Sequence, residues 1–97
     1  MNSPLTPTVH LNGTSGQCLL EGWTKLRDAL DEALLKTRQM EFNPRDYYPR
    51  GTEEWARAQH LMNERVAELN AFLEDVREVV EDLDRVMEER NARKANR

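Results

Sequence analysis

The chain has 97 residues, of which 38% are hydrophobic and 33% charged, and its formal net charge is −4. A domain of this size buries only a modest core, and a low apolar fraction is typical of long helices with a narrow buried stripe. Residues 52–97 carry twelve acidic and eight basic side chains, so the sequence lacks the basic face that generic DNA or RNA binding requires.

Cysteine content and hydropathy indicate the cellular compartment and argue against a metal site. The single cysteine, Cys18, cannot form an intrachain disulfide, and no Cys/His cluster has the spacing of a zinc site. Residues 1–9 lack the basic start and apolar centre of a secretory signal, and no apolar run approaches the ~20 residues that span a bilayer. We therefore expect a cytoplasmic protein with no cofactor, no metal and no membrane association.

The N-terminal segment, residues 1–13, contains two prolines and Gly13 without a helical period, which predicts an irregular arm. Thr14, followed three residues later by Gln17, has the form of a capping box, so a first helix should cover about 15–40. Its apolar residues recur at alternating steps of four and three, which predicts one buried seam. The seam consists of Leu19, Trp23, Leu26, Leu30, Ala33, Thr37 and Met40, with Leu20 and Leu34 beside it.

A second, longer helix is predicted after a connecting loop at 41–51, where Pro44, Pro49 and Gly51 interrupt the helical pattern. Thr52 is the expected cap, and the helix should cover about 53–90 before a frayed polar tail at 91–97. Its seam also has steps of four and three. The seam consists of Trp55, Gln59, Met62, Val66, Leu69, Leu73, Val76, Val80, Leu83 and Met87.

The predicted fold is thus an all-α helical hairpin, residues 14–90, with helices of roughly 39 and 57 Å. This mismatch predicts that the end of the long helix lacks a partner, although it carries Val79, Val80, Leu83, Val86 and Met87. Either the arm covers it through Leu5, Val9 and Leu11, or another subunit does. The sequence favours a homo-oligomer, a dimer or higher, in which two hairpins form a four-helix bundle.

Two polar stretches are unusual for a plain bundle. The first is the HLNGTS motif, residues 10–15, in which His10, Asn12, Thr14 and Ser15 lead into a helix start that favours an anion. The second is the RDYYP loop, residues 45–49, followed by Arg50. Its Arg45 and Arg50 suit phosphate or carboxylate, and its Tyr47 and Tyr48 can stack on a base. The alternatives are ordinary capping for the first stretch and tyrosines that plug the bundle end for the second.

No catalytic set is evident in the sequence. Cys18 lies near a helix start, but no base accompanies it, and the carboxylates of the long helix lack the histidines of a di-metal bundle. Trp23 and Trp55 lie on the seams and are expected to pack in the core. We therefore expect a protein that is not an enzyme.

These two motifs together resemble a set of small bacteriophage and prophage proteins that have an HLNGTS start and a central RDYYP loop between two helices. The resemblance covers about residues 10–90 and implies a phage context. Members of the set typically have Asn-Gly before the arginine and Gln after the proline, where this chain has Asn43-Pro44 and Arg50.

In that context the leading hypothesis is an accessory protein that binds a small anionic, nucleotide-derived ligand between subunits, as anti-defence sponges do. The alternative is an interaction module that binds a host or virion protein directly through the RDYYP loop. The expected ligand contacts are His10, Asn12, Thr14, Ser15, Arg45, Tyr47, Tyr48 and Arg50.

Overall fold

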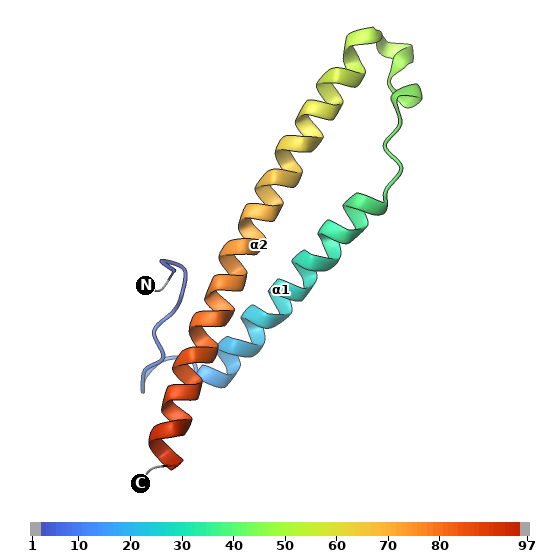
Figure 1. Cartoon of the computed structure of the whole chain (residues 1–97). Coiled ribbons are helices and arrows are strands. Elements are labelled where there is room, and N and C mark those ends of the chain that lie inside the picture. The colour runs from blue at the N-terminus through green and yellow to red at the C-terminus, as the bar shows by residue number, and fades with distance from the viewer. Residues whose placement is uncertain (1–2, 96–97) are drawn as a thin grey trace.

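A computed structural model describes residues 3–95 and contains two α-helices joined by two short 3-10 turns (Figure 1). Helix α1 covers Gly16–Gln39 and helix α2 covers Thr52–Ala95, while the turns η1 and η2 cover Pro44–Asp46 and Tyr48–Arg50. The predicted all-α hairpin is confirmed. Its long axis measures 70 Å and its shorter axes 22 and 20 Å, so the molecule is a rod. Neither described helix is long and apolar enough to cross a membrane.

The start of α1 differs from the prediction by one residue. Ser15, not Thr14, is the cap, since its Oγ accepts a hydrogen bond from the backbone N–H of Cys18 at 3.1 Å. Gln17 does not complete a capping box, because its side chain donates to Glu21 at 3.1 Å. Gly51 precedes α2 with φ of 125°, a conformation that favours glycine, and Thr52 is the first helical residue rather than the cap.

The end of α2 also differs from the prediction. Residues 91–95, expected to fray, are helical and exposed, while the last two residues of the expected tail lie outside the described part of the chain. No proline or glycine follows Gly51 to stop the helix, and Arg93 and Lys94 in its last turn suit the negative end of the helix dipole.

The core lies in the C-terminal half of α2, where α1 packs against it. The buried hydrophobic residues of the described chain are Leu34, Leu73, Val76, Val79, Val80 and Leu83. Gly16 approaches Met87, and Arg77 forms an ion pair of 2.6 Å with Asp31, so the helices are antiparallel. Leu34 is buried whereas Ala33 is exposed, which shows that the seam of α1 is rotated slightly from the predicted one.

The N-terminal arm lies along the same half of α2, on the other side from α1 in the view of Figure 1. The backbone N–H of Ser3 donates to the Asp82 carboxylate at 2.8 Å, and the Thr6 hydroxyl donates to the same oxygen at 2.6 Å. Val79 lies one turn before Asp82 and is fully buried. The arm and α1 therefore cover the apolar residues of α2 from Leu73 to Met87 within one chain, whereas residues 88–95 are exposed.

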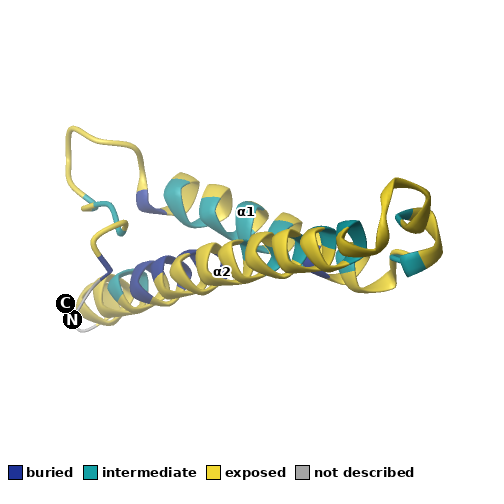
Figure 2. Cartoon of the chain, turned by 90° about the horizontal axis from the view of Figure 1, so that it is seen from above, coloured by how far each residue is buried: buried dark blue, intermediate teal, exposed yellow. Residues whose placement is uncertain are grey.

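This arrangement corrects the prediction that the end of the long helix lacks a partner. Val79, Val80 and Leu83 are buried, and Val86 and Met87 are half-buried. The arm does not achieve this through the expected leucines, because Leu5 and Leu11 are 46% and 97% exposed. The extended connection from Met40 to Gly51 shifts α1 toward the C-terminus of α2, so it is the first four turns of α2 that have no helix beside them (Figure 1). Figure 2 shows that the buried residues lie toward the other end of the rod.

Candidate functional site

An aromatic cluster fixes the connecting segment against the start of α2. The rings of Phe42, Tyr47 and Trp55 lie 4.8 to 5.7 Å apart in tilted and edge-on pairs. Two 3-10 turns with a proline in the first turn of each bring Tyr47 back toward the helix. Because each ring contacts both others, the cluster packs the loop against the start of α2 and forms a wall at this end of the hairpin.

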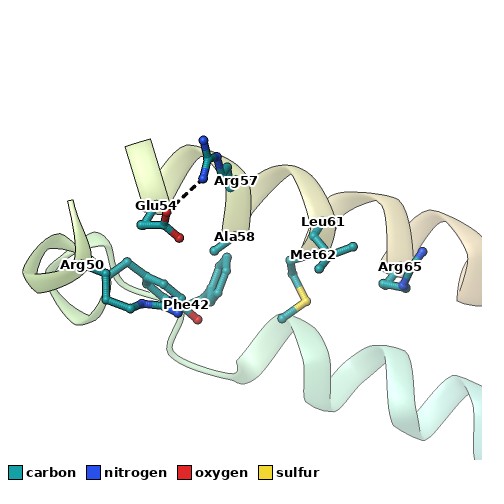
Figure 3. Close-up of a pocket in the computed structure, with 9 residues that line it drawn as sticks. Phe42, Arg50, Glu54, Arg57, Ala58, Leu61, Met62 and Arg65 are labelled. Carbon is teal, nitrogen blue, oxygen red and sulfur yellow. Dashed lines mark hydrogen bonds and ion pairs between the residues drawn. The ribbon is translucent and has the colours of Figure 1, made fainter. Parts of the chain in front are cut away.

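An open groove lies between this wall and the first turns of α2, and its cavity volume is about 490 Å³ (Figure 3). Its floor is apolar and consists of Ala58, Leu61 and Met62. Three arginines line it, Arg50 from η2 and Arg57 and Arg65 from α2, together with one acid, Glu54. The lining of the groove therefore combines an apolar floor with three arginines and one acid.

The arginines of the groove differ in how they are engaged. Arg57 forms ion pairs with Glu54 at 3.1 Å and Glu53 at 3.5 Å, and Arg65 forms one with Glu68 at 2.9 Å. All of these are short-range pairs on the surface of one helix, which contribute little to stability and exchange readily. Arg50 instead lies over the Tyr47 ring, 5.5 Å from its centre.

The predicted ligand residues do not form one site within the chain. Tyr47 and Arg50 line the groove, but Arg45 and Tyr48 do not, and Tyr48 is 57% exposed. The HLNGTS motif lies at the opposite end of the rod, where His10, Asn12 and Thr14 are exposed. The Ser15 hydroxyl already caps α1 by accepting the Cys18 N–H. The His10 ring packs closely against Gly13, since its Nε2 would lie only 2.6 Å from a Cβ at that position.

Sequence reasoning missed the residues that α2 contributes to the groove, namely Glu54, Arg57, Ala58, Leu61, Met62 and Arg65. Four of them, Glu54, Ala58, Leu61 and Arg65, have the same four-three spacing as the seam and form a second stripe beside it. That spacing was a usable signal. What the sequence could not reveal was that the connection from Met40 to Gly51 is extended and leaves α1 away from this stripe.

A metal site finds no support among residues 3–95. No group of three or more His, Cys, Asp or Glu side chains there is placed to hold a metal ion. No family model matches the chain, and no curated protein or solved structure is detectably similar to it.

Proposed function

We propose that the chain binds a small anionic ligand of the nucleotide type in the groove at the loop end of the hairpin, without catalysing its conversion. The observation that carries this proposal is the joint presence of an apolar floor, an aromatic wall and three arginines in one cavity of about 490 Å³. This volume lies in the ~300–1,000 Å³ range of small-molecule sites.

The two chemical parts of a nucleotide match the two parts of the groove. A base is flat and apolar on its faces, which suits contact with Leu61, Met62 and the edge of Phe42. Phosphate oxygens suit the forked donors of Arg50 and Arg57, which bind them bidentately. In the phage context that the sequence resemblance implies, such a protein would sequester a nucleotide signal of the host, as the sponge hypothesis requires.

Calorimetric titration of the full chain with linear and cyclic mono- and dinucleotides tests the proposal. We expect at least one member of this panel to bind, and Arg50→Ala to weaken its binding at least tenfold. Arg45→Ala is the matched control, since Arg45 lies in the same segment but outside the groove, and it should leave the affinity unchanged. Absence of binding across the panel, or equal losses in both variants, would refute the proposal.

A protein partner is the second candidate, and the position of Tyr48 favours it. This ring is 57% exposed, lies outside the groove and is followed by Pro49, features suited to an interface anchor. Under this alternative Tyr48→Ala abolishes co-purification of a host or virion protein and leaves nucleotide affinity unchanged.

A further inference from the structure

One face of the N-terminal half of α2 is left open. Residues at alternating steps of four and three share this face, and we call them the open stripe. The open stripe consists of Glu54, Ala58, Leu61, Arg65, Glu68 and Phe72. Leu61 is 49% and Phe72 43% exposed.

The same face is covered farther along α2. From Phe72 it continues at seven-residue spacing to Val79, which is fully buried, and to Val86, which is half-buried. The arm reaches this part of the helix through Asp82, whereas α1, the arm and the loop all leave Leu61 and Phe72 largely exposed. The open stripe is therefore a continuation of a core-forming surface that this chain does not cover by itself.

We propose that a second copy of this chain covers the open stripe from Glu54 to Arg65, with the two α2 helices antiparallel and related by a two-fold axis near residues 59 and 60. Phe72 then lies beyond the start of the partner's α2, at the level of its connecting loop. In this register Glu54 of each copy faces Arg65 of the other, and Ala58 faces Leu61. Opposite charges meet at both outer positions, and a small side chain meets a large one at both inner positions, as packing of two helices requires.

Charges at the edge of the open stripe agree with the same register. Arg57 and Glu64 lie on the same side of the stripe, and the two-fold axis brings each close to the other residue in the partner. Within one chain Arg57 pairs with Glu53 and Glu54, and Glu64 pairs with His60 at 3.0 Å, all on exposed surface and free to exchange. A parallel pair in register would instead place Arg65 against Arg65 and Glu54 against Glu54.

The second copy also changes the groove. Its helix would lie over Ala58 and Leu61, which form part of the groove floor, and would narrow the groove to its loop side next to Phe42, Tyr47 and Arg50. The inference rests on the proposed function only in naming what borders that site. The HLNGTS motif of the partner would remain about 40 Å from the groove, since 28 helical residues separate their levels. The two motifs thus serve different places in this dimer.

The mass of the full chain in solution, measured by light scattering and sedimentation between 1 and 200 µM, tests the inference. We expect twice the monomer mass of 11.4 kDa at the upper concentrations. Glu54→Arg alone and Arg65→Glu alone should each raise the dimer dissociation constant at least tenfold, because each places like charges face to face. The double variant Glu54→Arg/Arg65→Glu should restore it to within threefold of the unmodified chain. Glu81→Arg, an exposed change outside the open stripe, is the control and should leave it unchanged.

Disulfide formation checks the register independently. In a Cys18→Ser background, a mixture of Ala58→Cys and Leu61→Cys chains should form a mixed disulfide faster than either chain alone, with circular dichroism confirming that each is folded. A monomer at all concentrations, or failure of the double charge variant to recover, overturns the inference. If a monomeric chain still binds a nucleotide through Arg50, the proposed function stands and the dimer inference fails. If the chain is a dimer but binds no nucleotide, the dimer inference stands and the proposed function fails.

Discussion

The carboxylate of Asp82 joins segments of the chain that are nearly eighty residues apart in the sequence. One of its oxygens accepts the Ser3 N–H and the Thr6 hydroxyl, and the other accepts Arg85 at 2.9 Å. Asp82 is only 3% exposed, so its charge would be costly without these donors. The bond from Thr6 contributes most to lowering the pKa of Asp82 below its ordinary value of 3.8, followed by the bond from Ser3.

This lowered pKa predicts how the stabilisation of the fold by the bonds between the arm and Asp82 depends on pH. Because the folded carboxyl has the lower pKa, the unfolded chain binds protons more readily, so the stabilisation is complete at neutral pH. It declines below pH 3.8 and is lost as the pH falls through the folded pKa. We expect Asp82→Asn to lower the free energy of unfolding, measured in urea at pH 7. The variant should also lose less of this free energy than the unmodified chain when the pH is lowered below 3.8. Asp84→Asn, an exposed neighbour, is the control and should alter neither.

Two glycines of α1 predict substitutions of opposite effect. A Cβ at Gly16 would overlap the Met87 sulfur and lie 3.3 Å from a Val9 methyl carbon, so Gly16→Val should destabilise the fold by about 1–3 kcal/mol through overpacking. Gly22 has open space around its Cα, and Gly22→Ala should stabilise the helix by roughly 0.5–1 kcal/mol. Thermal unfolding followed by circular dichroism measures both. Equal effects of the two changes would show that α1 does not approach α2 at Gly16.

At the level of elements, the aromatic cluster makes the loop end of the hairpin a defined structure. Phe42→Ala removes a ring that contacts both Tyr47 and Trp55, and we expect a loss of roughly 1–3 kcal/mol, below the ~3–5 kcal/mol of a fully buried phenylalanine. In a Trp23→Phe background, the emission of Trp55 should shift to longer wavelength as water reaches its ring. An unchanged spectrum would mean that the cluster does not hold the loop.

The two helices could be predicted from the sequence because their signal is local. Apolar spacing located α1 and α2 to within a few residues of their bounds, and Pro44, Pro49 and Gly51 located the connection. The position of the arm depends on hydrogen bonds from Ser3 and Thr6 to Asp82. No sequence pattern around Ser3 or Thr6 indicates these long-range bonds. The groove was predictable only for Tyr47 and Arg50, since the contribution of α2 depends on where the extended connection places α1 along α2. The prediction also assumed a compact loop, which would place α1 beside the first turns of α2 and leave the C-terminal turns uncovered. The extended connection instead leaves the first turns of α2 uncovered.

For the whole molecule, the position of the self-association surface determines the shape of a dimer. A bundle that pairs two rods along their full length would remain about as long as one rod, 70 Å. The proposed register overlaps only the first turns of α2, so it predicts a maximum dimension of about 110 Å from the ~1.5 Å rise per residue. Small-angle X-ray scattering, at a concentration where the mass has doubled, distinguishes the full-length pairing from the proposed register. A maximum dimension near 75 Å would exclude the proposed register.

The uneven cover along α2 also has a consequence for its backbone amides. Residues 73–83 are held between α1 and the arm, whereas residues 52–68 have only the connecting loop beside them. A helical segment of that length is marginal in water by itself, so it should open without unfolding the remainder of the protein. Hydrogen exchange should therefore be fast in the first four turns of α2 and slow beyond Leu73, within one continuous helix. A second subunit or a ligand on the groove would slow exchange selectively in those first turns.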